Sequence, residues 1–551
     1  MKTLKYIGIL LFTSLASCNY LDIDDSNMIK KDLIGDNPSR VDQLWAATYN
    51  ALPNEYNTLG LSIACDEAES NNPFNNYQIY NVGGWNEFNN PDDEWASTYE
   101  AIRKCNLFFQ LTDTITYKRY QISDPVQYQV YISNLTSYRQ EVRFLRAFYH
   151  FELMKRYGNV PIVDRLLTQE DAKKIKRSTY TECVTFIASE CNAIVASLPL
   201  KWEDAQIGRI TIGTVLALKS RLFLYASSPL FVNQPDTYDL SYCDSTINAA
   251  GALIKLNQYN LNIAYPDVFT KVDVNSEIIL DRRIANNNTQ EFANYPLSGN
   301  PAYVVKVGTN GINPSQNLVD AYDRKTVATG TDPYNGLDPR LEFTVLVNNR
   351  TYNESVVSAW KGGIDGIGNK NATTTGYYLK KYLTEKLNLK NNNVASHVWH
   401  IFRYAEVLLN YAETANEKYG PDVIPVGQTL TALAAINQIR DRVGVKMPLY
   451  AAGISKVDFR EMIRNERRVE LAFEGHRFWD VRRWLIAEQT ENTALMGMEI
   501  TKDAANNFTY TKIKIEDRKF IAPAMYRYPI PYSDWARYDF LEQTPGWNST
   551  K

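Results

Sequence analysis

The chain of 551 residues lacks several features that would identify a function at once. It has four histidines, six cysteines and a formal net charge of −3 at pH 7. A nearly balanced charge without a concentrated basic patch gives no reason to expect a nucleic-acid partner. After the first 25 residues, no apolar run reaches the length of about 20 residues that a membrane-spanning helix needs.

Catalytic signatures are also missing. The sequence has no G-x-S-x-G elbow, no P-loop, no G-x-G-x-x-G and no H-E-x-x-H pattern. A glycosidase needs two carboxylates across a cleft, and no pair of acids stands out. We therefore expect a binding protein rather than an enzyme, with no cofactor.

The four histidines are His150, His397, His400 and His476. The spacing of His397 and His400 would put both on one face of a helix, where they could hold a metal. No third ligand stands nearby, so a structural role is favoured and no metal is expected. His476 and Asp480, four residues apart, sit among many charges and are also interpreted as structural.

The cysteines form no metal-binding pattern. Without Cys18 an odd number remains, with spacings that match no zinc motif. Two of them lie eight residues apart on one expected helix, too far along it to pair with each other. We expect buried thiols, with room for one disulfide, at Cys65, Cys105, Cys183, Cys191 and Cys243.

The first residues have the pattern of an export signal. Lys2 and Lys5 precede a short apolar stretch, and Leu15-Ala16-Ser17 places small residues directly before Cys18. This segment resembles the lipobox of bacterial lipoproteins; the alternative is an ordinary signal peptide with a chance cysteine. We expect a signal peptide over 1–17, a lipidated Cys18 and a polar tether over 18–40.

Helical periodicity dominates two blocks, about 41–256 and 400–551. Apolar residues recur there every three to four positions, as on one face of a helix. Helices joined by short turns favour a mostly α, tetratricopeptide-like scaffold of helical pairs, although no clean 34-residue repeat is visible. The expected helices are Val41–Leu52, Glu94–Leu111, Arg139–Tyr157, Thr179–Leu198, Thr211–Ser227, Leu240–Leu256, Tyr404–Asn416, Thr429–Val443 and Val457–Ala487.

Two stretches differ from this scaffold. Residues 257–399 are rich in Asn, Gly, Pro, Tyr and Thr, with short strands expected at Glu277–Leu280, Phe343–Val347 and Tyr377–Lys381. Residues 69–93 form a second loop-rich insert. Loops this long in a compact protein are usually functional. We expect one domain over 41–551, in which an irregular loop-rich subdomain with short β-strands interrupts the helices.

Aromatic residues are abundant, with 37 Tyr, 21 Phe and 10 Trp. Most tryptophans fall in expected helices or near the C-terminus, which leaves Trp85 and Trp360. Each stands beside glycines, which let a loop bend and would leave the indole face open. An open ring can stack on a sugar while amides and charged groups satisfy its hydroxyls. The candidate ligand contacts are Trp85, Trp360, Tyr77, Phe74, Asn72, Tyr334 and Arg283.

Eight segments together resemble one family, the SusD/RagB outer-membrane lipoproteins. They run in order along nearly the whole chain. They are EVRFLRAFYHFELMKRYGNVPIV (141–163), GRITIGTVLALKSRLFLYASSPL (208–230), PSQNLVDAY (314–322), DPRLEFTVL (338–346), TGYYLKKY (375–382), FRYAEVLLNYAETAN (402–416), NERRVELAFEGHRFWDVRRW (465–484) and 528–547, with YPIP and QTPGW.

The resemblance implies a function and a partner. It implies a cell-surface glycan-binding lipoprotein, held in the outer membrane by its lipid anchor and facing the exterior. It also implies that the protein is the lid of a SusC-like TonB-dependent barrel. The RagB branch of the family implies an alternative, in which the same lid protein binds peptides instead of glycans. A surface glycoside hydrolase is a more distant alternative. The family's ligand sites are built from the N-terminal insert and the middle segment, but these share no motif, so no binding residue is transferred.

The segment Asn465–Trp484 is rich in both Arg and Glu. On a helix, Glu466, Glu470 and Glu474 would form one row that arginines such as Arg467 can reach. We expect an ion-pair network that locks the scaffold rather than a catalytic or phosphate-binding arginine cluster.

Overall fold

The computed structural model describes residues 37–203, 206–272, 275–299, 311–538 and 541–547. Cys18, the expected signal peptide and nearly all of the tether lie outside these residues. Within the described part, no helix is both long enough and apolar enough to cross a membrane.

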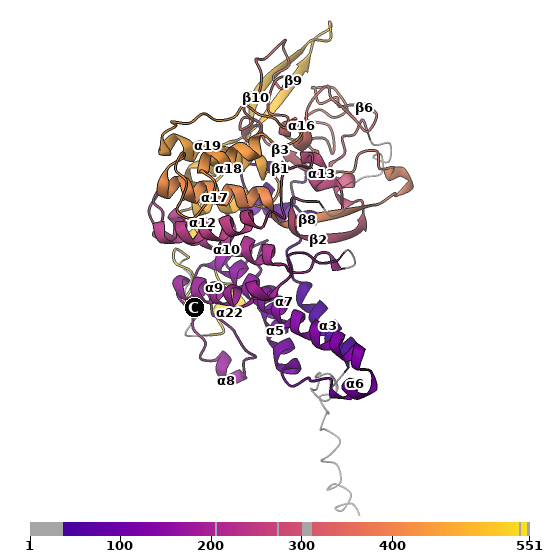
Figure 1. The fold of residues 1–551 in the computed structure, drawn as a ribbon. Coiled ribbons are helices and arrows are strands. Elements are labelled where there is room, and N and C mark those ends of the chain that lie inside the picture. The colour runs from indigo at the N-terminus through magenta and orange to yellow at the C-terminus, as the bar shows by residue number, and fades with distance from the viewer. Residues whose placement is uncertain (1–36, 204–205, 273–274, 300–310, 539–540, 548–551) are drawn as a thin grey trace, which may run out of the picture.

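The long helices form a continuous stack, which confirms the expected helical scaffold. In chain order α5 packs on α7, α7 on α9, α9 on α10 and α10 on α12. The next neighbour of α12 is α17, although the middle segment separates them in sequence, and α17 contacts α18 and α19 (Figure 1). Their bounds are α5 Trp95–Thr112, α7 Pro125–Tyr157, α9 Tyr180–Ile194, α10 Ile212–Ser227, α12 Leu240–Lys255, α17 Tyr404–Tyr419, α18 Ala432–Arg440 and α19 Lys456–Glu470.

Capping residues set where these helices begin. Thr179 and Glu182 form a capping box at the start of α9. The side chain of Asp124 accepts a hydrogen bond from the backbone N–H of Gln127, and Pro125 occupies the first turn of α7. Helix α7 therefore begins well before Arg139, which is the start that the sequence pattern predicts.

The single helix expected over Val457–Ala487 is wrong. Helix α19 ends at Glu470, and α20 begins only at Arg477 (Arg477–Arg483). Between them Phe473 and Gly475 have φ of 62° and 73°, a left-handed conformation that ends a right-handed helix. Glu474 therefore leaves the row of Glu466 and Glu470.

The middle segment carries short antiparallel strand pairs. Strand β2 (Ile278–Asn287) pairs with β8 (Ala395–Arg403), and the expected strands near 343–347 and 377–381 are present as the β4–β7 pair. A hairpin of β9 (Leu495–Lys502) and β10 (Phe508–Glu516) was not expected from the sequence. The other strands are β1 Ala68–Ser70, β3 Ile312–Pro314, β4 Val345–Leu346, β5 Thr351–Tyr352, β6 Ser355–Val356 and β7 Tyr378–Leu379.

The helix expected to contain His397 and His400 is instead strand β8, which also contains Trp399. Residues three apart in a strand point to opposite faces, so the two imidazoles do not face one site. His397 Nε2 lies 3.3 Å from the Asn287 carbonyl, and His400 Nε2 lies 2.7 Å from the Val268 carbonyl. Among the described residues, no group of three or more His, Cys, Asp or Glu side chains could hold a metal ion.

Short helices connect these elements. They are α3 Pro38–Tyr49, η1 Glu55–Asn57, α4 Gly60–Ile63, η2 Asn76–Tyr80, α6 Lys118–Ser123, α8 Gln169–Ala172, η3 Val195–Ser197, α11 Pro229–Val232, α13 Tyr265–Thr270, α14 Thr289–Asn294, α15 Gln316–Val319, α16 Arg340–Thr344, η6 Leu389–Asn391, α21 Ala487–Thr490, η7 Ala524–Tyr526 and α22 Tyr532–Trp535.

A buried ion network joins the middle segment to the helical stack. Arg403, at the end of β8, donates to Glu277 at 2.7 Å, to Glu470 at 2.8 Å and to Glu474 at 2.6 Å. All four side chains are essentially buried. Burial would raise the pKa of Glu470, but the guanidinium groups around it, Arg403 among them, lower that pKa to about 2. The expected scaffold-locking network is confirmed.

The network extends to both sides of α19. Arg340 contacts Glu466 at 2.6 Å and Glu470 at 2.9 Å, and Arg467 contacts Asp480 at 2.7 Å. A buried charge without a partner costs several kcal/mol, so each of these contacts fixes where its segment can lie.

The five described cysteines are free thiols and all are buried. Burial raises the pKa of Cys105, Cys191 and Cys243 to about 12. No disulfide joins any of the described cysteines.

Replacing Arg403 by Met should be strongly destabilising, because it leaves three buried carboxylates without their shared cation. We expect a loss of about 3–5 kcal/mol in the free energy of unfolding, measured with urea. The control is Lys512→Met, because the Lys512–Asp320 pair has side chains 53% and 49% exposed. That change should cost at most about 1 kcal/mol. Equal small losses in both variants would contradict the role of Arg403.

Glu67 should make stability fall as pH rises. Burial, and secondly Asp66, raises its pKa from 4.5 to about 7. Below about pH 4.5 the carboxyl is protonated in both the folded and the unfolded chain. Between about pH 4.5 and 7 the unfolded chain loses its proton first, so the folded state loses stability, and above about pH 7 that loss is complete.

Glu67→Gln should therefore be more stable than the parent by up to roughly 3 kcal/mol at about pH 8, and equally stable at about pH 4. Urea unfolding at both pH values measures this, with exposed Glu354→Gln as the control. A difference between Glu67→Gln and the parent that does not change with pH would contradict the assignment.

Candidate functional site

The N-terminal insert begins with a chain of local hydrogen bonds that fixes a tight turn. Ser70 Oγ accepts a hydrogen bond from the Asn72 backbone N–H at 3.1 Å, and Asn72 Oδ1 accepts one from the Phe74 N–H at 3.0 Å. Asn75 Oδ1 then caps helix η2 through the Tyr77 N–H at 3.0 Å. Such asparagine turns replace regular secondary structure with a defined loop. Phe74, at the tip of this turn, is 90% exposed.

This turn lies against the middle segment. Strand β1 pairs with β3, and beyond the ladder the Asn71 N–H donates to the Gly311 carbonyl at 3.1 Å. The Gly311 N–H donates in return to Asn71 Oδ1 at 2.9 Å. A Cβ on Gly311 would lie 2.8 Å from Asn71 Nδ2, so only glycine fits this close approach.

A third segment meets the same place. Asn71 Nδ2 donates to the Asn371 carbonyl at 3.3 Å, and Asn313 Oδ1 accepts from the Thr374 N–H at 2.9 Å. Residues from 71–77, 311–313 and 371–374, distant in sequence, therefore meet at one place on the surface, where 311–313 are buried and Asn72, Phe74, Asn371 and Thr374 are at least partly exposed. We call this surface the junction.

Buried polar side chains support the junction from below. Glu69 accepts a hydrogen bond from Gln78 Nε2, and Arg518 Nη2 donates to the Ala68 carbonyl at 3.0 Å. Glu69 is 4% exposed, and burial, with Glu516 as the second cause, raises its pKa to about 7. The Glu69 carboxyl therefore holds the junction from inside the protein and does not face solvent.

Trp85 does not have the open ring face that its glycines suggested. The indole is 2% exposed and packs edge-on against Tyr528 at 5.2 Å and Trp547 at 4.8 Å between ring centroids. Gly83, with φ of 65°, turns the chain so that the ring points inward. The glycines thus bury this tryptophan against the C-terminal segment.

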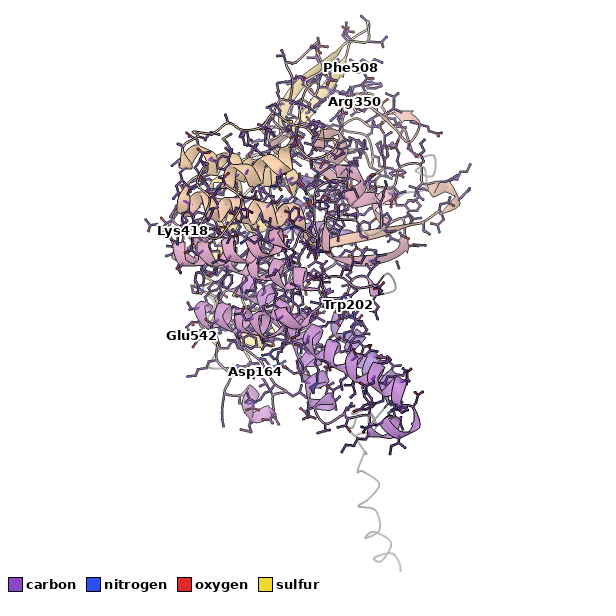
Figure 2. All side chains as sticks on the ribbon, in the orientation of Figure 1. Asp164, Trp202, Arg350, Lys418, Phe508 and Glu542 are labelled. Carbon is purple, nitrogen blue, oxygen red and sulfur yellow. The ribbon has the colours of Figure 1, made fainter. Side chains whose placement is uncertain are left out.

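Trp360 is partly buried. Its ring centroid lies 5.6 Å from that of Phe508 and 4.6 Å from the Lys502 ammonium, both on the β9–β10 hairpin. Figure 2 shows Phe508 on this hairpin, which projects from the top of the molecule. Trp360 begins the glycine-rich segment whose far end, at Asn371, reaches the junction.

The other candidates lie in different surroundings. Tyr334 is 4% exposed and donates to the Tyr377 hydroxyl at 3.1 Å. Arg283 is exposed on β2, opposite Val398. Tyr77 is partly buried and its ring covers Gly60, where an added Cβ would lie 2.3 Å from the ring. The structure therefore keeps Asn72 and Phe74 in the turn at the junction, while the Tyr77 ring packs over Gly60 and Trp85 and Tyr334 are packed inside.

Sequence reasoning missed Asn371 and Thr374. Both stand in a stretch of Asn, Thr and Gly that looks like many other loops, and only the fold places them beside the insert. Hollows also lie elsewhere: one of about 470 Å³ lined by residues such as Phe343 and Lys380, one of about 460 Å³ lined by residues such as Asn353 and Leu387, and one of about 290 Å³ lined by residues such as Trp95.

Comparison with known proteins places the chain in a family. A model described as the SusD family matches residues 276–547, and one described as "starch-binding associating with outer membrane" matches residues 19–224. SusD-like protein P38 of Formosa agariphila is 23% identical over 424 residues, which cover 70% of this chain and 71% of that protein. SusD-like protein P25 of the same species is 20% identical over 516 residues, 86% of this chain and 88% of its own length.

Solved structures agree along almost the whole chain. A SusD-like protein of Bacteroides fragilis is 26% identical with a TM-score of 0.75, covering 93% of this chain and 98% of that one. A SusD-like carbohydrate-binding protein of the same species is 22% identical with a TM-score of 0.73, covering 92% and 99%. A laminarin-binding SusD-like protein is 19% identical with a TM-score of 0.64, again covering 92% and 99%. With two family models covering most of the sequence and this shared architecture, the chain belongs to the SusD family.

Proposed function

We propose that the protein captures glycans at the junction and does not cleave them. The observation that carries this proposal is the 90% exposure of Phe74 at the tip of a hydrogen-bonded turn. An aromatic ring costs free energy when it is left in water, and the turn keeps the ring from folding back. A rigid exposed ring suits stacking on the C–H face of a sugar.

The polar side chains of the junction suit sugar hydroxyls. Asn72, Asn76 and Thr374 offer amide and hydroxyl groups, which can both donate and accept hydrogen bonds. Two structural relatives are described as carbohydrate-binding and laminarin-binding. At 22% and 19% identity they show the fold alone, so the glycan class is our proposal for this chain.

The position of the acid nearest to the turn supports binding without cleavage. A glycosidase needs two carboxylates on either side of the scissile bond. Glu69, the acid that supports the junction, points into the protein toward Gln78 and Arg518. Glu69 is therefore not available as one of such a pair.

We also propose that the glycan is passed to a transporter. In this account Cys18 is lipidated, the protein stands on the outer face of the outer membrane, and its body is the lid of a SusC-like TonB-dependent barrel. The lipobox-like sequence and the description of the second family model support this. We take 41–551 as one domain with inserts at 69–93 and 257–399, and a hydrophobic core that extends from Val41 to Leu541 supports this division.

Phe74→Ala should weaken glycan binding without affecting folding, because the ring contributes little to the core. We expect a loss of about tenfold in affinity, roughly the 1.4 kcal/mol of one stacking contact. Calorimetry with a panel of oligosaccharides and peptides measures the affinity. If the protein binds peptides and no sugar, the glycan proposal is wrong and the lid would instead serve the uptake of peptides.

The matched control for this test is Phe88→Ala. Phe88 belongs to the same insert and is 69% exposed, but it packs on Tyr532 at 4.5 Å between ring centroids. Its replacement should leave glycan affinity unchanged. Equal effects of the two changes would argue against a site at Phe74. Trp85→Ala is not a suitable control, because removing a buried indole should cost about 3–5 kcal/mol of stability.

Cys18→Ser should release the protein from the membrane fraction. A serine cannot carry the thioether-linked lipid, and after the signal peptide the sequence has no apolar run long enough to span a membrane. Cell fractionation measures the release, and protease treatment of whole cells tests whether the parent protein faces outward. A Cys18→Ser protein that stays in the membrane fraction would contradict lipid anchoring.

A further inference from the structure

An arm projects from the lower end of the molecule, formed by α3, α6 and the first turns of α7 (Figure 1). The far end of α3 touches the body, where Arg282 Nη1 of β2 donates to the Asn50 carbonyl at 3.2 Å. The far end of α7 is also in the body, where the Tyr157 hydroxyl donates to Asp93 at 2.7 Å. The beginnings of both helices therefore lie at the outer end of the arm.

Three aliphatic side chains are exposed at this outer end. Ile122 is 90% exposed, Val126 78% and Val130 44%. Val126 and Val130 are four residues apart on α7 and so share one face of the helix, and Ile122 lies just before its start. Single exposed aliphatic residues are ordinary, but three within nine residues at a projecting end form a patch. We call it the tip patch.

The arm does not need the tip patch for its own packing. The other face of α7 carries Tyr131, whose ring lies 5.5 Å from that of Tyr117 and 4.9 Å from that of Tyr120. The start of α7 is thus apolar on two sides, and one of them already has its partners within the arm. A surface helix normally buries a single apolar face.

The position of the tip patch in the chain suggests what covers it. The described chain begins at Asn37, directly before α3, and α3 packs on α7. Cys18 is 19 residues earlier, so even a fully extended chain puts the two at most ~65 Å apart. A lipid on Cys18 therefore keeps the outer end of the arm, where α3 begins, within that distance of the membrane surface, so that the tip patch can reach it.

We propose that Ile122, Val126 and Val130 insert into the lipid surface beside the anchor. This inference rests on the lipid anchor proposed above. The nearby sequence carries charges of both signs, Lys118 and Arg119 together with Asp113 and Asp124, so it has no excess of basic residues for anionic lipid. The contact is therefore apolar, and salt should change it little.

Such a contact gives the protein an orientation. Three aliphatic side chains bind a membrane weakly by themselves, but a tether raises their effective concentration at the surface. A lipid alone leaves the body free to tumble around its tether. A lipid together with the tip patch holds the arm down and directs the opposite end of the molecule, with the β9–β10 hairpin, away from the membrane.

The test uses a nitroxide label in the lipidated full-length chain. Because the described native cysteines are all buried, a thiol reagent should label only an introduced surface cysteine. The variant is Val126→Cys, and the matched control is Val426→Cys, whose valine is 86% exposed in the connection between α17 and α18. Both are placed in vesicles of phosphatidylethanolamine and phosphatidylglycerol. Spin relaxation by oxygen, which concentrates in lipid, is compared with relaxation by a water-soluble nickel complex.

The label at position 126 should shift toward oxygen access and away from nickel access, at low and at high salt, while the label at 426 stays water-like. If the protein floats with the vesicles but both labels are as accessible to the nickel complex as a label in water, the tip patch does not insert into lipid. The lipid anchor would still be supported. If the lipidated chain does not float with the vesicles, the anchor fails and this inference fails with it. A label at 126 shielded from both oxygen and nickel would show a protein contact and overturn the lipid as occupant.

Discussion

The arrangement of the middle segment depends on a buried ion network in which Arg403 binds three carboxylates. Arg403 is the last residue of β8, and it binds Glu277, which directly precedes β2, together with Glu470 at the end of α19 and Glu474 in the turn after it. The two ends of the middle segment, near Glu277 and Arg403, are therefore attached to the helical stack at the same place. Because an unpaired buried charge is so costly, only conformations that keep these contacts are populated.

This constraint positions the junction. With both ends of the middle segment held at α19, β3 can reach β1, and the loop at 371–374 can reach Asn71. Buried ion pairs of this kind are weak evidence for added stability, since desolvation offsets most of their attraction. Here their effect is on geometry: they fix where the loops of a largely irregular segment lie.

The helices could be predicted because their information is local. The stripe of apolar residues in α17 and the Thr211 cap of α10 are visible within one or two turns. The break after α19 could not be predicted, because Glu474 leaves the helix to bind Arg403, 71 positions away. His397 and His400 fall in a strand because β2 pairs with β8, which is again a distant contact.

The candidate site divides in the same way. Asn72 and Phe74 could be found because the loop-rich insert that carries them, with its aromatic and amide side chains, is visible in the local sequence. Trp85 was expected to be open, yet its partners Tyr528 and Trp547 come from the opposite end of the chain. Asn371 and Thr374 join the site only through the fold.

The most direct test of glycan capture at the junction is amide hydrogen exchange with and without a bound oligosaccharide. The account predicts slower exchange at residues 71–76 and 371–374, and protection confined instead to the hollow around Phe343 and Lys380 would contradict it.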